Sequence, residues 1–321
     1  MKMQSKTQKL TTLGLLLALG IILPFATAHG IGVSGGILLP MHIPVFICGF
    51  LCGPLFGALC GVVLPIINSL LTNMPPLYPM MPIMVCELTV YGFVSGLLYH
   101  KTPLGKHKIG VYISLLIAMV FGRVAYGLAY QILLIISKEL TASTVWVAIA
   151  TGVPGIVVQL LLVPTVVFAI EGAYLKGRKN MINSAKNLIT KGKATCVVIK
   201  NGQIINIESG NGIKPVITLY EQCLFVDATV VDKIIGKATA MILVLGKVKS
   251  CYGVTISKSA LKYLTDHNVS VGFDTCVDHI VNRSGDGVCP MEQTVKDIDS
   301  PEEALVALKS KLQELSINKN I

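Results

Sequence analysis

Residues 41–71 read MHIPVFICGFLCGPLFGALCGVVLPIINSLL and contain no Asp, Glu, Lys or Arg. A bilayer core about 30 Å thick needs about 20 apolar residues in each helix that crosses it. The pair Gly53-Pro54 interrupts the run, because proline removes a helical hydrogen bond and clashes with the preceding turn. The stretch therefore predicts two membrane helices, over residues 43–52 and 55–71, of which the first is short for a crossing.

The segments on either side extend the same pattern. The chain is 53% hydrophobic and only 14% charged, with a mean hydropathy of +0.69, which is typical of membrane proteins. Four further apolar stretches, at residues 10–28, 79–99, 109–136 and 145–174, bring the expected number of transmembrane helices to six. From residue 176 onward charged residues return at ordinary density. We therefore expect an α-helical membrane domain over residues 1–178, a linker over 179–193 and a small cytosolic α/β domain over 194–321.

Basic residues flank the predicted helices in three clusters. They are Lys2, Lys6 and Lys9, then Lys101, Lys106 and Lys108, and then Lys176, Arg178 and Lys179. Cytoplasmic loops carry an excess of Lys and Arg. Six crossings with both termini in the cytoplasm place all three clusters on that side, whereas five crossings misplace one. We therefore expect a multi-pass cell-membrane protein.

The net charge of +10 does not indicate nucleic-acid binding, because no basic stripe with interleaved aromatic residues is present. The nine cysteines show no paired C-x-x-C spacing, so they predict neither a metal site nor a disulfide framework. Free thiols agree with a cytosolic location for the second domain.

Polar side chains inside the apolar stretches are candidates for a binding site, because a charge within a bilayer is costly unless it is paired or functional. The candidates are His42, Asn68, Glu87, Arg123, Tyr126 and Gln159. Glu87 and Arg123 could form a purely structural ion pair. Alternatively, Arg123 faces an aqueous cavity and meets an anionic or strongly polar ligand, with Tyr126 and Tyr130 on the same helical face. His42 is expected at the outer rim of that cavity, or simply at a helix entry.

In the first predicted helix, Gly14 and Ala18 form a strip of small residues one turn apart. Such strips allow close helix approach. The strip could pack inside the bundle or form a docking face for a separate membrane subunit.

Residues 41–99, with the H-I-P entry, the G-P break and the loop MPPLYP, resemble the substrate-binding S components of energy-coupling factor (ECF) vitamin transporters. The resemblance covers about 165 residues. It implies a six-helix bundle that captures a vitamin-like molecule and associates with a transmembrane coupling subunit and two ATPase subunits. It also implies that Gly14 and Ala18 meet the coupling subunit. Because the chain has no G-x-x-x-x-G-K-[ST] motif, the ATPases are expected to be separate proteins.

The sequence after residue 193 predicts strands and helices in alternation. Asn201-Gly202 between alternating apolar residues predicts a hairpin. Residues 227–246 follow helical periodicity, 249–257 and 269–277 predict strands, and 258–268 predict a short helix. Ser300 followed by Pro301 predicts the start of a terminal helix. The sum is a three-layer α/β domain.

This second half resembles uncharacterised bacterial domains with a cytidine-deaminase-like fold, through the motifs at residues 212–215, 232–238 and 282–292. Zinc deaminases need H-x-E and P-C-x-x-C ligand motifs. In this chain Gly236-Lys237-Ala238 stands where the H-x-E motif is expected, and Cys289 offers one thiol where P-C-x-x-C has two. We therefore expect no metal, cofactor or catalytic residue.

A pocket for a phosphate or a nucleotide-like base remains a candidate in this half. Its residues would be Asp232, Lys237, Asn282, Arg283, Asp286, Cys289 and Glu292. Alternatively, Arg283 and Asp286 pair across a turn and Cys289 is an inert thiol. The favoured function is a vitamin-capture subunit with a regulatory or ligand-binding cytosolic domain. The alternative is a membrane-tethered enzyme that processes the imported nucleoside- or vitamin-like compound.

Overall fold

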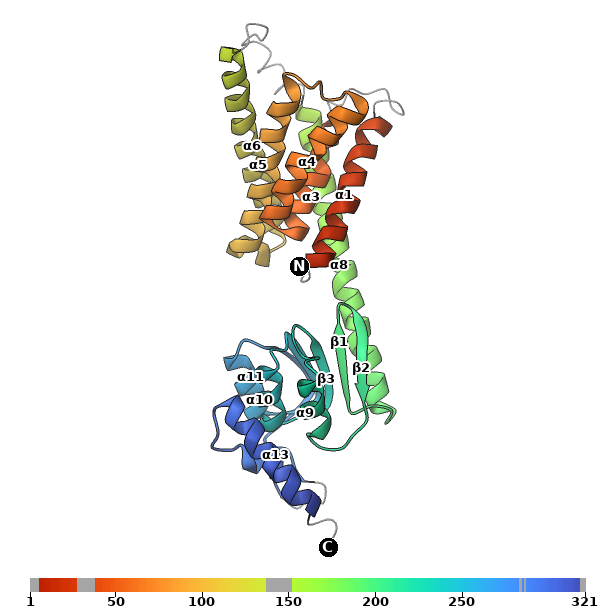
Figure 1. Ribbon diagram of the computed structural model, residues 1–321, viewed down its shortest axis with the longest axis vertical. Coiled ribbons are helices and arrows are strands. Elements are labelled where there is room, and N and C mark those ends of the chain that lie inside the picture. Colours follow the sequence, from red (N-terminus) through yellow and green to blue (C-terminus); the bar gives the residue numbers. More distant parts are fainter. Residues whose placement is uncertain (1–5, 28–37, 137–151, 283–284, 286, 318–321) are drawn as a thin grey trace. The chain divides into compact units, whose positions relative to one another are not determined.

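A computed structural model describes residues 6–27, 38–136, 152–282, 285 and 287–317 of the chain. The chain divides into two compact units, Met1–Ala173 and Tyr174–Ile321. The first unit is a helical bundle and the second contains a β-sheet flanked by helices (Figure 1). The predicted fold class, an α-helical membrane domain followed by an α/β domain, is confirmed.

The bundle is built from helices α1 (Lys6–Ala26), α3 (His42–Cys52), α4 (Pro54–Thr72), α5 (Met80–Lys101), α6 (Ile109–Ile136) and α8 (Val153–Thr190), with a short 3-10 helix η2 (Pro103–Lys106). Among the described residues, five of these helices are long and apolar enough to cross a membrane. Helix α3 has 11 residues, which at 1.5 Å per residue span only about 16 Å. Of the six predicted crossings, five are therefore formed by helices of sufficient length among the described residues, and α3 is too short to cross a core of about 30 Å, because Gly53 ends it.

Consecutive helices of the bundle run in opposite directions (Figure 1). The Cys52 thiol, at the end of α3, lies 3.8 Å from the backbone oxygen of Lys9, near the start of α1. His100 Nε2, at the end of α5, lies 2.8 Å from the backbone oxygen of Phe50 in α3. The start of α1 and the ends of α3 and α5 therefore lie at one end of the bundle.

Glycines allow α3, α4 and α5 to pack closely. Gly53 connects α3 to α4 with φ of 96°, a backbone conformation that residues with a Cβ rarely adopt. A Cβ on Gly92 of α5 would collide with the backbone of Gly57 in α4, and the reverse is also true. The backbones of these two helices are therefore in direct contact, which fixes the position of α5 and of the polar side chains it carries.

The second unit contains a five-stranded mixed sheet in the order β2-β1-β3-β4-β5. Strands β1 (Cys196–Lys200), β2 (Gln203–Glu208) and β3 (Thr229–Ile235) pair antiparallel, whereas β4 (Ser250–Ser257) and β5 (Ser270–Val277) continue the sheet in parallel. The helices are α9 (Lys214–Glu221), α10 (Lys237–Leu245), α11 (Lys258–Asp266), α12 (Pro290–Thr294) and α13 (Pro301–Ile317).

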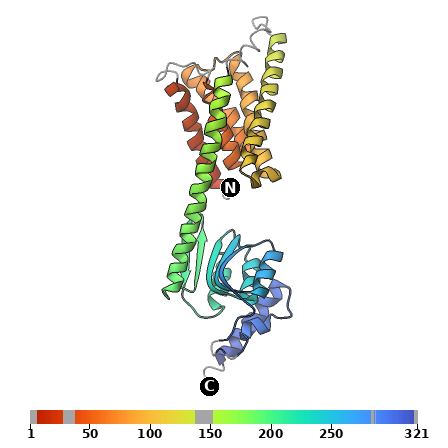
Figure 2. The ribbon, with the colours of Figure 1, turned by 180° about the vertical axis from the view of Figure 1, so that it is seen from behind.

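Helices cover both faces of this sheet, as predicted for a three-layer domain. One face packs against α9, α10, α11 and α13. The opposite face packs against the last turns of α8, where Ala185 and Ile189 contact Val197, Ile199 and Val231 (Figure 2). Residues 179–193, expected to be a linker, thus include a structural layer of the second unit.

Local sequence signals account for most of these elements. Asn201 and Gly202 have positive φ values and join β1 to β2, which confirms the hairpin. Ser300 Oγ accepts a hydrogen bond from the backbone N–H of Glu303 at 3.3 Å and caps α13, as expected. The prediction of one helix over residues 227–246 is wrong in its first half, which forms β3. The β-branched residues of TVVDKII favour a strand, and the helix begins only after Gly236.

Candidate functional site

A cluster of ionisable side chains is buried in the bundle, where α3, α5 and α6 meet. Arg123 Nη1 lies 3.1 Å from Glu87 Oε1, and His42 Nε2 lies 3.7 Å from Glu87 Oε2. The Tyr91 hydroxyl donates a hydrogen bond to Glu87 Oε1 at 2.8 Å. The side chains of His42, Glu87 and Arg123 are 1%, 2% and 16% exposed. The possible Glu87–Arg123 pair is therefore formed, and three predicted residues are brought together.

The local sequence places each of these groups. His42 is the first residue of α3, and Pro44 is tolerated in the first turn, where backbone N–H groups have no helical partner. Glu87 and Tyr91 are four residues apart on α5, so their side chains lie on one helical face. Tyr91 was not among the predicted site residues, although this spacing is the signal that could have found it.

Arg123 retains hydrogen-bonding capacity after it pairs with Glu87. Its Nε and Nη2 atoms are buried and have no hydrogen-bond partner in the described part of the chain. A guanidinium presents its N–H groups as a rigid fork, which matches two oxygens of a carboxylate or phosphate. Because Glu87 contacts Nη1, Nε and Nη2 form the edge of the guanidinium that has no partner among the described residues, here called its open edge. Neither ring nitrogen of His42 has a hydrogen-bond partner among the described residues.

Two tyrosines on α6 provide an aromatic surface beside the guanidinium. The Tyr126 ring stacks on that of Tyr130, with centroids 6.2 Å apart. Arg123 Cζ lies 6.0 Å from the centre of the Tyr126 ring, within the range of a cation–π contact. Both tyrosine side chains are buried. The predicted common face of these three residues on α6 thus forms one wall of the cluster.

Asn68 and Gln159 make different contacts. Asn68 Nδ2 donates hydrogen bonds to the backbone oxygens of Gly20 and Leu64, at 3.2 Å and 3.1 Å. Gln159 Nε2 lies 3.5 Å from the backbone oxygen of Leu39. These bonds connect α4 to α1, and α8 to the segment before α3. They give both residues a role in packing, and none of these bonds involves the cluster around Glu87.

In the second unit, Lys237 and Glu292 meet at the N-terminus of α10. Glu292 Oε1 accepts a hydrogen bond from the backbone N–H of Lys237, and burial raises the pKa of Glu292. Both residues line a pocket of about 640 Å³ between α10, α11 and the segment that contains α12. Other residues that line this pocket are Ser259, Lys262, Tyr263, Asp266, Asp278, His279, Val288, Gln293, Lys296 and Asp299.

Asp232 lies within the sheet, next to two buried thiols. It is 7% exposed on β3, opposite Cys196 of β1. Burial raises its pKa to about 7, although the backbone N–H of Ile234 donates a hydrogen bond to Oδ1 at 3.1 Å. Burial also raises the pKa of Cys251, to about 12. Asp232 does not line the pocket that contains Lys237 and Glu292.

The remaining candidates of the second unit belong to the segment before α12. Asn282 Oδ1 accepts a hydrogen bond from the backbone N–H of Gly285 at 2.8 Å, and Cys289 is the residue before α12. Arg283 and Asp286 lie outside the described residues, so their expected roles stay predictions. In the part of the chain that the structure describes, no three His, Cys, Asp or Glu side chains are arranged to hold a metal ion.

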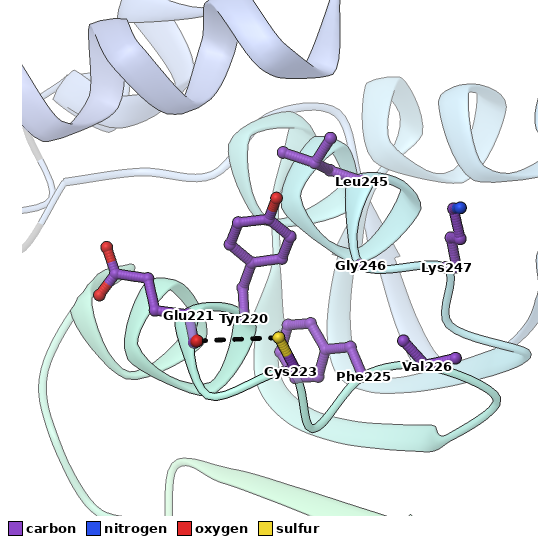
Figure 3. A pocket seen from close by; sticks show the side chains of 8 residues that line it. All are labelled: Tyr220, Glu221, Cys223, Phe225, Val226, Leu245, Gly246 and Lys247. Atoms are coloured by element: carbon purple, nitrogen blue, oxygen red, sulfur yellow. Dashed lines mark hydrogen bonds between the residues drawn. The ribbon is translucent and has the colours of Figure 1, made fainter.

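A second pocket of about 290 Å³ lies where α9 and α10 end (Figure 3). Figure 3 shows Tyr220 and Phe225 among the residues that line it, and the Cys223 thiol directed at the backbone oxygen of Glu221, 3.9 Å away. No residue of this pocket was among the predicted candidates. Its residues come from two helix ends and the turns that follow them.

Two family models match different parts of the chain. One is described as "ECF transporter, substrate-specific component" and matches residues 8–167. The other is described as a domain of unknown function, DUF1893, and matches residues 184–312. The chain joins an ECF substrate-specific component to a DUF1893 domain. The ionisable cluster of the bundle therefore lies in the substrate-specific component, and the two pockets lie in the DUF1893 domain.

One similar solved structure is that of a DUF1893 family protein from Thermotoga maritima, whose sequence is 30% identical to this chain. The match covers 41% of this chain and 90% of that protein, with a TM-score of 0.39. A comparison with curated proteins gives no match. The fusion predicted from the sequence is confirmed, with family boundaries that place part of α8 in the DUF1893 domain.

Proposed function

We propose that the bundle is the substrate-capture subunit of an ECF-type importer and that its substrate is a vitamin-like molecule with a carboxylate group. The substrate-specific component gives the chain a substrate-binding role in transport and a place in the membrane. ECF substrate-specific components work with a membrane coupling subunit and ATPases. The geometry around Arg123 supports the chemical class of this substrate, a carboxylate.

The observation that carries this proposal is the open edge of Arg123. A buried, unpartnered N–H group costs about 1–3 kcal/mol, and two nitrogens of Arg123, Nε and Nη2, have no partner in the described part of the chain. A carboxylate bound to that edge would form two charge-assisted hydrogen bonds. Glu87 would hold the guanidinium in place through Nη1, and Tyr126 would offer a flat apolar surface to the rest of the ligand.

We also propose that both chain termini are cytoplasmic. The start of α1 lies at the same end of the bundle as the ends of α3 and α5. Lys6 and Lys9 lie in the first turns of α1, and Lys101, Lys106 and Lys108 lie between the last residue of α5 and the start of α6, so both basic clusters are at this end of the bundle. The positive-inside rule places that end in the cytoplasm.

Matched pairs of acids and neutral analogues test the substrate class. The purified full chain in detergent would be titrated with nicotinate and nicotinamide, pantothenate and panthenol, and biotin and biotinamide. We expect the acid of at least one pair to bind at least about tenfold more tightly than its neutral partner, since two charge-assisted hydrogen bonds exceed 1.4 kcal/mol. Preferential binding of the neutral members, or equal binding throughout, would contradict the proposal.

Gly14 and Ala18 are proposed to form the docking face for the coupling subunit. Both are exposed on α1, and a Cβ on Gly14 would meet no atom within 4 Å, so this strip does not pack inside the bundle.

The Gly14→Trp variant should reduce ATP-driven uptake in proteoliposomes that contain the coupling subunit and ATPases by about tenfold or more, because the bulky ring prevents close helix approach. Ligand binding should be unchanged. Val120→Trp on the exposed face of α6 is the matched control. Equal uptake by both variants would refute this docking face.

For the DUF1893 domain we propose ligand binding or regulation. The pocket of about 640 Å³ that contains Lys237 and Glu292 supports this proposal. The deaminase-like fold stays a prediction, supported by a five-stranded mixed sheet with helices on both faces.

A further inference from the structure

The His42 ring is buried in the cluster around Glu87. Its side chain is 1% exposed, and neither Nδ1 nor Nε2 is hydrogen-bonded within the described residues. A buried polar group without a partner is costly and requires an explanation. The group that faces it most directly is the Glu87 carboxylate, at 3.7 Å from Nε2.

The ionisable groups around His42 come from two helices. Helix α5 contributes Glu87 and Tyr91, whose ring centroid lies 5.4 Å from that of His42. Helix α6 contributes Arg123 and Tyr126. Of the other helices packed against α3, α4 has no Asp, Glu, Lys, Arg, His or Tyr, and Lys9 of α1 lies beside the opposite end of α3.

Charge balance in this site changes when a carboxylate binds. In the empty site one carboxylate, Glu87, faces one guanidinium, Arg123. A carboxylate ligand on the open edge of Arg123 adds a second negative charge, which a buried site of low dielectric strongly disfavours. Histidine is the side chain that gains a positive charge most readily near neutral pH, and His42 lies against Glu87.

Without a ligand, Arg123 alone balances the charge of Glu87. A bound carboxylate would leave one negative charge unbalanced, and the His42 imidazole is the group beside Glu87 that could take up a proton to restore the balance.

We propose that the site binds its carboxylate ligand together with one proton, and that this proton is taken up by His42. The inference rests on the carboxylate substrate proposed above. A ligand anion and a proton from water enter the site, and no covalent bond other than the N–H bond on the ring is formed. The bound state then contains two carboxylates, one guanidinium and one imidazolium, so its net charge equals that of the empty site.

A variant of Arg123, measured in the absence of ligand, tests this charge balance. Arg123→Gln removes the guanidinium and leaves Glu87 as an uncompensated negative charge, the same imbalance of one charge that a ligand would create. The thermal midpoint of the full chain in detergent would be measured from about pH 6 to about pH 8, which spans the ordinary titration of imidazole. Relative to the wild type, we expect this variant to be roughly 5–10 °C less stable at the alkaline end and close to wild type at the acidic end.

Two double variants assign the proton to His42. In Arg123→Gln/His42→Gln the recovery at acidic pH should be lost, because no imidazole is present. In Arg123→Gln/Glu87→Gln the pH curve should run parallel to that of the wild type, because no charge is left to neutralise. Recovery that persists without His42, or parallel curves for Arg123→Gln and the wild type, would overturn the proposal. If Arg123→Gln can be extracted at neither pH whereas Arg123→Gln/Glu87→Gln can, the proposal is also overturned, since His42 did not compensate.

A second measurement uses the wild-type protein. Calorimetric titration with sodium nicotinate and with sodium pantothenate, each in phosphate and in Tris buffer, reports proton uptake as the difference in apparent binding enthalpy between buffers. We expect uptake approaching one proton near pH 7.5 for an acid that binds, and none in His42→Gln. Binding without a buffer dependence would reject proton uptake and leave the carboxylate substrate intact. Failure of both acids to bind would count against the proposed substrate, and the ligand-free variants would still decide the role of His42.

Discussion

Replacing Arg123 with lysine should weaken the binding of a carboxylate ligand by about 10- to 100-fold, while the bundle remains folded. Lysine keeps the positive charge that Glu87 needs, but an ammonium is a point donor and cannot present two parallel N–H groups. The loss of one charge-assisted hydrogen bond of about 1.5–3 kcal/mol accounts for this range. The acid that binds in the matched-pair titration would be the ligand.

Arg178→Lys provides the matched control for this substitution. Arg178 donates a hydrogen bond from Nη2 to Ser250 Oγ at 2.9 Å within the second unit, so the same chemical change is made far from the cluster in sequence. Its affinity for the acid should equal that of the wild type. Equal affinities for Arg123→Lys and the wild type, with a normal thermal midpoint, would mean that the open guanidinium edge does not bind the ligand.

The charged members of the ionisable cluster could be found from the sequence because the residues around them are apolar. A charged residue in a long apolar stretch is conspicuous, so Glu87 and Arg123 were identified before any geometry was known. Tyr91 was missed because tyrosine is compatible with an apolar helix, and its contact with the Glu87 carboxylate depends on side-chain direction as well as spacing. The open edge of Arg123 depends on which nitrogen meets Glu87, and no sequence pattern contains that information.

The boundary between the two units was harder to predict than their folds. The segment after residue 178 is polar enough to suggest a linker, yet Ala185 and Ile189, four residues apart, form a buried stripe on α8 that packs on the sheet. A short stripe on a polar helix is a weak signal, because a partner surface must exist before it can be buried. The burial of Asp232 was equally hard to predict from the sequence. It follows from the pairing of β3 with β1 on one side and β4 on the other, and the sequence of β3 alone does not contain that information.

Replacing Asp232 with asparagine should remove a strong pH dependence from the stability of the DUF1893 domain. Burial raises the pKa of this carboxyl from its ordinary value of 3.8 to about 7, so the folded state holds a proton that the unfolded state releases. This stabilising contribution is complete below about pH 4 and is lost as the pH rises to about 7. At about 1.36 kcal/mol per pKa unit, the loss in unfolding free energy is about 4 kcal/mol at most. Asparagine keeps the acceptor for the Ile234 N–H group but does not titrate.

Urea unfolding of residues 174–321 between about pH 4 and about pH 8 would measure this effect. The wild-type free energy of unfolding should fall relative to that of Asp232→Asn as the pH rises, and the difference should level off above about pH 7. Asp274→Asn is the matched control, because the hydrogen bond from Lys186 lowers the pKa of Asp274, and any contribution of that partly exposed carboxyl is lost as the pH falls. Parallel pH curves for the wild type and Asp232→Asn would show that Asp232 ionises in the folded domain as readily as in the unfolded chain, and that its surroundings in the sheet tolerate the charge.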